Sequence, residues 1–241
     1  MEGLRVPLEF WLPLPGIAKE EAVIVTNTLI VAVLIFVGSL LVTRAARRNP
    51  GALQTSLEIL IDWLLDMLRT SIGKTGQRYL PFVASLFLFI LFSNIIGLIP
   101  GFVSPTSNVN TNLALALLVV LLATPIVGVQ QLGLLGYLRH KGGPIPYLAP
   151  FVFLFETIGE LARPVSLTIR LFTNIRSGDI LLLTLIVVFM GMPYNPIVPL
   201  LSLLSLTFGL FVAFVQAYVF TFLTVVYFAG ASGWGEHANE A

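Results

Sequence analysis

Charged side chains interrupt an apolar stretch in the second half of the chain, FETIGELARPVSLTIRLFTNIRSGDILLLTLIVVF. A charge at the centre of a membrane-spanning helix costs about 2.5–3.5 kcal/mol on insertion scales, so such residues usually face a protein interior or a water-filled path. We therefore expect the function to lie in this stretch. Its charged residues are Glu156, Glu160, Arg163, Arg170, Arg176 and Asp179.

Helical periodicity separates these residues into two groups. At about 100° per residue, an arc of about 80° contains Glu156, Glu160, Arg163, Arg170 and Asn174. Arg176 and Asp179 fall on another side of the helix. Glu160 and Arg163 are three residues apart and can pair, neutralising each other near the cytoplasmic end. Glu156 and Glu160 repel each other unless one of them is protonated or paired.

Arg170 has no carboxylate among its helical neighbours, which are Ser166, Leu167, Thr173 and Asn174. The last long apolar segment, 197–228, contains no acidic residue either. Its partner must come from elsewhere in the chain or from another subunit. We favour a carboxylate on another membrane subunit over capping by backbone carbonyls and Asn174.

Two acids lie on either side of Arg170 along the same segment. Glu156 lies toward the cytoplasmic side, and Asp179 follows 23 residues later toward the outside. An arginine stays protonated in proteins, so it conducts no proton itself and repels cations. The order acid, arginine, acid therefore suggests two offset ion paths with a barrier between them. Gln216 adds an amide in the last segment, where a group at mid-membrane depth needs partners.

The composition sets the class of protein. Of the 241 residues, 57% are hydrophobic and 10% are charged, whereas soluble domains carry about 25% charged residues. The net charge of +1 gives no electrostatic case for binding nucleic acid. With no cysteine, and with His140 and His237 outside the apolar runs, we expect no metal and no cofactor. We also expect no cleavable signal peptide.

Five apolar segments are long enough to cross a membrane as helices. Their residues are 22–42, 81–100, 112–135, 147–189 and 197–228. The last two exceed the roughly 20 residues that a perpendicular crossing needs, so we expect them to tilt. Basic residues in the intervening loops place the N-terminus outside and the C-terminus in the cytoplasm. These features predict an all-α membrane protein with one integral membrane domain over residues 1–241.

Residues 53–69 have a different pattern from the five spans. Their leucines and isoleucines repeat at helical spacing, and Glu58, Asp62 and Asp66 repeat every four residues on the opposite side. This pattern predicts an amphipathic helix on the cytoplasmic surface of the membrane. Its acidic face either is solvated or contacts a protein partner, and the pattern leaves both alternatives open.

Several motifs together resemble subunit a of the F-type ATP synthases. RPVSLTIRLFTNIRSGDILL is similar to the family signature KPxSLxxRLFGNxxAG[ED], and SNIIGLIPG, SNVNTNLALAL and LFVAFVQAYVFTFLTVVYFAGAS are similar to other spans. The chain departs from the family at Thr173, where glycine is usual, and at Arg176, where an uncharged residue is common. Arg176 can pair with Asp179 at i, i+3.

The resemblance implies a fold, partners and residue roles. The two long helices would form a hairpin against a ring of c subunits, in a bacterial inner membrane, with a peripheral stalk subunit b and the rest of the synthase as further partners. Arg170 would face the ion-carrying carboxylate of each c subunit, beside Asn174 and Gln216. Glu156 would serve the cytoplasmic half-channel and Asp179 the outer one.

The function so implied is to conduct protons to and from the ring, with no catalysis of bond chemistry by this chain alone. Alternatives are a Na⁺-coupled version of the same subunit, a self-contained ion channel or transporter, and a structural subunit of a redox complex. The absence of an inverted repeat argues against a transporter, and the unpaired Arg170 argues against a purely structural role.

Overall fold

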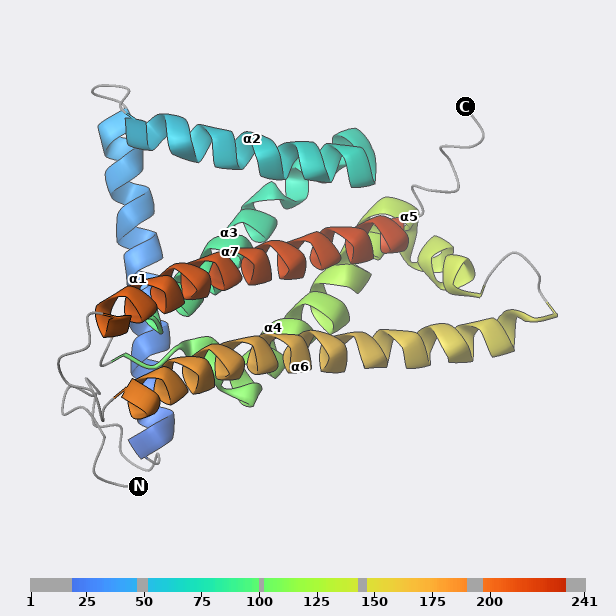
Figure 1. The fold of residues 1–241 in the computed structure, drawn as a ribbon. Helices are drawn as coiled ribbons and strands as arrows, with labels where there is room; N and C mark the ends of the chain where they lie inside the picture. The colour runs from blue at the N-terminus through green and yellow to red at the C-terminus, as the bar shows by residue number, and fades with distance from the viewer. Residues whose placement is uncertain (1–18, 47–51, 100–101, 143–146, 190–196, 233–241) are drawn as a thin grey trace. The chain divides into compact units, whose positions relative to one another are not determined.

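The computed structural model describes residues 19–46, 52–99, 102–142, 147–189 and 197–232 (Figure 1). Within these ranges the chain forms helices and turns and contains no β-strand. The α-helices are α1 (Lys19–Ala46), α2 (Ala52–Ile72), α3 (Leu80–Ile96), α4 (Val109–Leu117), α5 (Thr124–Lys141), α6 (Ala149–Phe189) and α7 (Ile197–Ser232). The predicted all-α fold class is confirmed.

Four helical stretches of the described chain are long and apolar enough to cross a membrane. They are Glu21–Arg44, Gln54–Ile96, Val109–Arg139 and Leu203–Ser232. Helices suit this setting because hydrocarbon offers no hydrogen bonds, so each backbone group must find its partner within the chain. The chain is therefore a multi-pass membrane protein. The 41-residue α6, which corresponds to the predicted span 147–189, is not among these four stretches. Its first half carries three charged residues, Glu156, Glu160 and Arg163.

Helix α2 is amphipathic, as the spacing of its residues predicts. Leu64, Leu68 and Ile72 recur every four residues and are fully buried, whereas Glu58, Asp62 and Asp66 on the opposite face are exposed. The buried face belongs to a hydrophobic core shared with α3, α5 and α7, whose members there are Val83, Val127, Val225 and Phe228. A seven-residue 3₁₀-helix, Gly73–Tyr79, then leads into α3.

The end of α3 comes four residues before the predicted boundary at Pro100. The backbone turns instead, with the amide of Leu98 donating to the carbonyl of Ile95 at 3.0 Å. A side chain at Gly97 would place a Cβ only 2.6 Å from the Cβ of Ser104. Glycine is therefore required where the returning loop passes closest to the helix end.

The third predicted span, 112–135, is not one regular helix. α4 ends at Leu117, and a π-helical segment, Leu118–Ala123, precedes α5. The hydroxyl of Thr124 donates to the carbonyl of Val119, five residues earlier, at 2.8 Å. A period of 3.6 residues cannot reveal such a segment, because the apolar pattern continues unbroken through it.

Two glycines let α5 turn back on itself. Gly133 has φ 73° and ψ 165°, a conformation outside the helical range and essentially restricted to glycine. Beyond this kink the ring of Tyr137 packs against Gly128, where an added Cβ would collide with two ring carbons. The kink thereby brings the last turn of α5, which ends at Lys141, to the side of α6.

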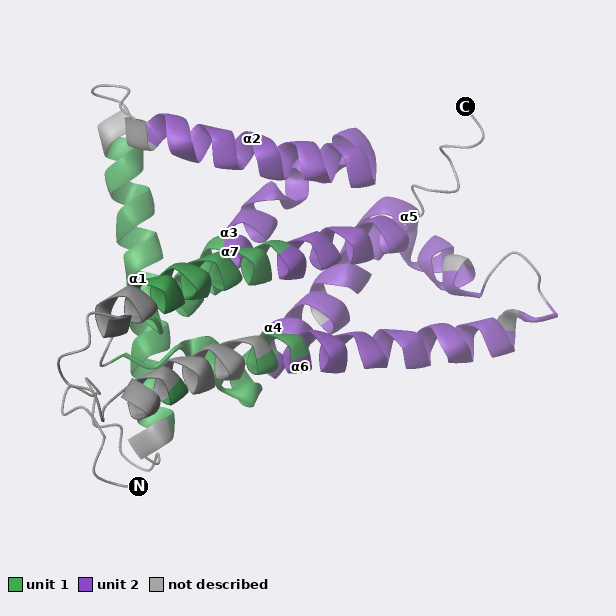
Figure 2. Cartoon of the chain, viewed as in Figure 1, with its two compact units in different colours: residues 1–44, 88–112, 170–218 green, residues 45–87, 113–169, 219–241 purple. Residues whose placement is uncertain are grey.

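The chain forms two compact units, and each is assembled from three separate segments rather than from consecutive sequence (Figure 2). Unit 1 comprises Met1–Arg44, Leu88–Asn112 and Arg170–Tyr218. Unit 2 comprises Ala45–Phe87, Leu113–Ile169 and Val219–Ala241. Arg170 and Gln216 therefore belong to unit 1, whereas Glu156, Glu160 and Arg163 belong to unit 2.

Replacing Gly133 with alanine should destabilise the protein by about 1–3 kcal/mol, because its backbone conformation is costly for any residue with a Cβ. The free energy of unfolding in mixed detergent micelles measures this. Gly159→Ala is the matched control, since nothing lies within 4 Å of an added Cβ there. That change in a helix interior should be neutral or stabilising by up to about 1 kcal/mol. Equal effects of the two substitutions would refute the role of the kink.

Candidate functional site

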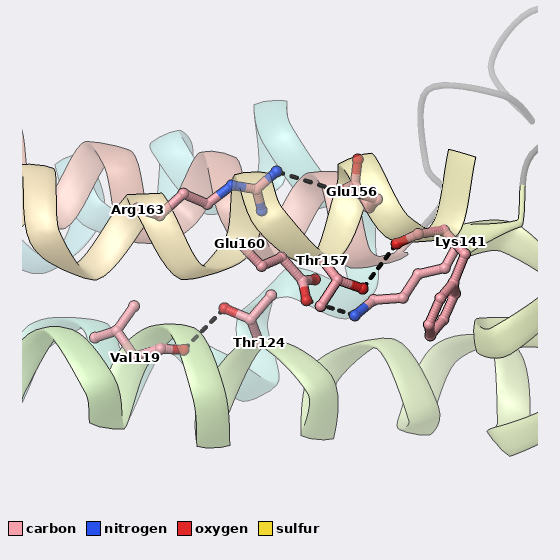
Figure 3. A network of polar contacts seen from close by, with 8 residues as sticks. Val119, Thr124, Lys141, Glu156, Thr157, Glu160 and Arg163 are labelled. Carbon is pink, nitrogen blue, oxygen red and sulfur yellow. Dashed lines mark hydrogen bonds and ion pairs between the residues drawn. The ribbon is translucent and has the colours of Figure 1, made fainter. Parts of the chain in front are cut away.

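Three charged residues of α6 gather with the last residue of α5 (Figure 3). Glu160 accepts a hydrogen bond from the ammonium group of Lys141 at 2.5 Å, and both side chains are 13% exposed. Arg163 donates to Glu156 at 3.3 Å, with side-chain exposures of 31% and 44%. We call these four residues the charged cluster. Each carboxylate in it has one cation as its partner.

The prediction that Glu160 pairs with Arg163 is wrong. Lys141 reaches Glu160 from α5 because the chain kinks at Gly133, and this position could not be read from spacing along α6. Arg163 instead reaches two turns back to Glu156, and its guanidinium lies 5.0 Å from the ring centroid of Tyr227. Pairing with two different cations removes the repulsion expected between Glu156 and Glu160.

Lys141 remains charged in this setting. Burial lowers the pKa of Lys141, but its hydrogen bonds with Glu160 and Tyr137 and the charge of the Glu160 carboxylate together outweigh burial. The pKa of Lys141 therefore lies above its usual value of 10.5. Its stabilising contribution is fully present below 10.5 and is lost only as the pH rises through the raised pKa. Lys141 therefore stays protonated, and can donate to Glu160, throughout the physiological pH range.

A cavity of about 160 Å³ opens beside the charged cluster. Its wall includes all four charged residues together with Thr124, Tyr137, Val152, Gly230 and Ala231. A water molecule takes up about 30 Å³ of liquid volume, so the cavity has room for roughly five waters. Ionic walls supply the several polar partners that such waters need. The carboxylates of Glu156 and Glu160 thus border a space that suits water.

Arg170 has a different environment from the charged cluster. It lies on the exposed face of α6, together with Ser166 one turn before it and Thr173 one turn after it. Its neighbours Leu167 and Leu171, on the other face of the helix, are buried. Among the described residues no ion pair or hydrogen bond engages the guanidinium group. A permanent charge thus stands on the surface of an apolar helix, between two small side chains.

The remaining predicted site residues are described less fully. Helix α6 includes Asn174, Arg176 and Asp179, but the structure does not describe their side chains. The expected pairing of Arg176 with Asp179 therefore lies outside the described residues. Gln216 of α7 lies in the same unit as Arg170 and is only 3% exposed. Its burial contrasts with the exposure of Arg170.

Unit 1 contains a buried polar cluster that the sequence analysis did not predict. Ser104 donates to the carbonyl of Ser93 at 2.7 Å and lies 2.7 Å from the hydroxyl of Thr106. Thr106 in turn donates to Asn94 at 2.6 Å, and Asn94 donates to the carbonyl of Ala213 on α7 at 3.4 Å. The sequence offered one signal for this polar cluster, namely uncharged polar residues within and next to apolar helices.

Two amide oxygens at the edge of this polar cluster lack partners. Asn27 donates to the carbonyl of Val103 at 2.8 Å, and Asn112 donates to the carbonyl of Thr106 at 2.7 Å. The side-chain oxygens of Asn27 and Asn112 are buried and accept no hydrogen bond in the described structure.

The described residues offer no candidate metal site, because nowhere among them do three histidine, cysteine or acidic side chains converge.

Comparison with known proteins gives a consistent result. The family described as ATP synthase A chain matches residues 24–229. The chain is 41% identical over 216 residues to ATP synthase subunit a 3 of Pelobacter propionicus, covering 89% of this chain and 90% of that protein. It is 43% identical over 214 residues to ATP synthase subunit a of Trichlorobacter lovleyi, covering 89% and 88%. The Aquifex aeolicus subunit is 42% identical over 190 residues, covering 78% and 87%.

The two ion pairs of the charged cluster should differ in strength. In a double-mutant cycle, Lys141→Met and Glu160→Gln should give a coupling energy on the order of 1–3 kcal/mol, because both side chains are largely buried. The cycle of Arg163→Gln and Glu156→Gln should give less than about 1 kcal/mol, because that pair is longer and more exposed. Unfolding free energies in micelles provide both values. A weaker coupling for the lysine pair than for the arginine pair would contradict the assignment.

Proposed function

The chain belongs to the ATP synthase A chain family, and on that premise we propose that it is the ion-conducting stator subunit of an F-type ATP synthase. In this role it passes protons through two offset half-channels to and from the carboxylates of a ring of c subunits. Proton flow turns the ring, and the rotation drives ATP synthesis elsewhere in the complex. One elementary charge crossing 100 mV supplies about 2.3 kcal/mol.

The exposed, unpartnered charge of Arg170 is the observation that carries this proposal. A charge on an apolar helix is costly unless a partner neutralises it, and none of the described residues does so. A ring carboxylate that arrives beside Arg170 would be stabilised in its ionised form. Ser166 and Thr173 are small, which favours close approach by a helix of the ring. Because an arginine keeps its proton, Arg170 also blocks a direct leak between the two paths.

Glu156 is the proposed proton carrier of the cytoplasmic half-channel. It borders the cavity beside the charged cluster and is the more exposed of the two carboxylates there, at 44%. Glu160 is held by Lys141 and is far less accessible, at 13%. Asp179 is the proposed carrier of the outer half-channel, and Asn174 and Gln216 are the proposed polar neighbours of Arg170.

The proposed orientation in a bacterial inner membrane follows from the distribution of basic residues. The N-terminus lies outside, and the C-terminus and α2 lie on the cytoplasmic side. The exposed acidic face of α2 is then available to the peripheral stalk subunit b. Glu58, Asp62 and Asp66 on that face would attract basic side chains of such a partner.

Replacing Arg170 with alanine should abolish ATP-driven proton pumping by inverted membrane vesicles, because the ring carboxylates would lose the permanent charge that is proposed to face them. Arg170→Lys should also fail or nearly fail, since lysine lacks the planar guanidinium and can lose its proton. Arg44→Ala, at the last turn of α1, is a control that should leave pumping intact. Near-normal pumping by an assembled Arg170→Ala complex would refute the central proposal.

Glu156 and Asp179 should be reachable by water from opposite sides of the membrane. The chain has no cysteine, so Glu156→Cys and Asp179→Cys each introduce a single thiol. Silver ion should protect position 156 from a maleimide only from the cytoplasmic side, and position 179 only from the outside. Ile158→Cys, on an exposed apolar position, should react poorly from both sides. Access to 156 and 179 from the same side would overturn the half-channel assignment and the orientation.

A further inference from the structure

A second, larger cavity lies in unit 2 and has no part in the proposed proton path. Its volume is about 740 Å³, within the range of about 300–1,000 Å³ that is typical of small-molecule sites. Its lining comes from the end of the 3₁₀-helix, the start of α3, the π-helical segment, α5 and α7. The lining residues are Arg78, Tyr79, Phe82, Leu118, Ala123, Ile126, Val127, Gln130 and Phe228.

Most of the wall of this cavity is apolar and aromatic. Phe228 stacks on Phe82 at 5.9 Å between ring centroids and meets the ring of Tyr79 edge-on at 5.6 Å. Phe82, Phe228 and the lining residues Leu118 and Ile126 all belong to stretches that are apolar enough to lie in a membrane. The body of the cavity therefore suits a hydrocarbon chain.

The π-helical segment contributes directly to this wall. Leu118 and Ala123 are its first and last residues, and both line the cavity. In an α-helix, residues five apart lie about 140° apart around the axis. The i to i+5 pattern of a π-helix brings them to nearly the same side. π-Helical turns are frequent at functional sites, and here the turn directs both ends of the segment to one cavity.

Polar groups collect at one place in the wall. Tyr79 donates to the side-chain oxygen of Gln130 at 3.3 Å, which leaves the amide nitrogen of Gln130 as a donor. Arg78 is exposed, and no ion pair or hydrogen bond joins its guanidinium to the described residues. The positive-inside rule places residues 43–79 on the cytoplasmic side, where anionic headgroups are abundant. Arginine binds phosphate with two parallel hydrogen bonds.

We propose that this cavity is a binding site for one phospholipid with an anionic headgroup, whose phosphate contacts Arg78 and Gln130 and whose acyl chain packs along Phe82, Ile126 and Phe228. Basic pockets between membrane helices on the cytoplasmic side characteristically hold such headgroups. The site lies within unit 2 and does not depend on the proton path. The proposal rests on the proposed orientation, which places Arg78 on the cytoplasmic side, but not on the proposed proton path.

Native mass spectrometry of the purified complex tests the headgroup contact. After delipidation, the complex is incubated with equal amounts of phosphatidylglycerol and phosphatidylcholine, and bound lipid is counted. The wild type should retain phosphatidylglycerol in preference. Arg78→Ala should reduce this preference about five-fold, equivalent to about 1 kcal/mol for one basic residue near an anionic headgroup. Arg139→Ala, an exposed cation outside the lining, should leave the preference unchanged.

The acyl-chain contact has its own variant and control. Ile126→Trp should fill the cavity and abolish retention of either lipid. Leu121→Trp, an exposed position in the same π-helical segment that does not line the cavity, should retain phosphatidylglycerol as the wild type does. A benzophenone side chain introduced at Ile126 should form an adduct with lipid. An adduct mainly with another subunit, or an unchanged lipid preference in Arg78→Ala, would overturn the proposal.

Discussion

Leaving a charge without a partner on an apolar helix costs about 3 kcal/mol, and this cost governs where the charged residues of α6 lie. Glu160 is neutralised by Lys141 of α5 and Glu156 by Arg163, so the four residues of the charged cluster together carry no net charge. Arg170 is the exception, because no described residue neutralises it. In the proposed function, a carboxylate of the ring of c subunits removes this electrostatic cost only while it lies beside Arg170.

The same cost of unpartnered polar groups shapes the buried polar cluster of unit 1, whose members carry no formal charge. Ser104, Thr106 and Asn94 satisfy one another in a buried chain of hydrogen bonds, which fastens the loop after α3 to the helix before it. The amide oxygens of Asn27 and Asn112 remain unsatisfied. Buried polar atoms of this kind are the usual sites of internal water. Each unit thus holds polar side chains that other polar groups of the same unit partner: the charged cluster in unit 2 and the hydrogen-bonded polar cluster in unit 1.

The sequence predicts the helices well, because long apolar runs and the two-faced pattern of α2 are properties of consecutive residues. The expectation that Arg170 has no carboxylate among its helical neighbours agrees with the described part of α6, where no ion pair engages Arg170. Sequence reasoning failed where tertiary geometry decides. The π-helical segment leaves the apolar pattern unchanged, and the kink at Gly133 is one glycine among 20. The sequence pattern does not reveal the kink and leaves Lys141 in the loop after the span 112–135. The pairing of Lys141 with Glu160 could therefore not be predicted.

The π-helical segment also bears on how this chain tolerates changes in length. A π-helical turn is what one additional residue produces when an α-helix accommodates it without breaking. Deleting one residue between Leu118 and Ala123 would let the segment return to regular α-helical geometry, and local stability would suffer little. Because the wider turn absorbs the additional residue, the residues after the deletion would keep nearly their present orientation relative to α4. Lys141 would then still face Glu160, so the π-helical turn makes the charge balance of a distant helix independent of one residue of length.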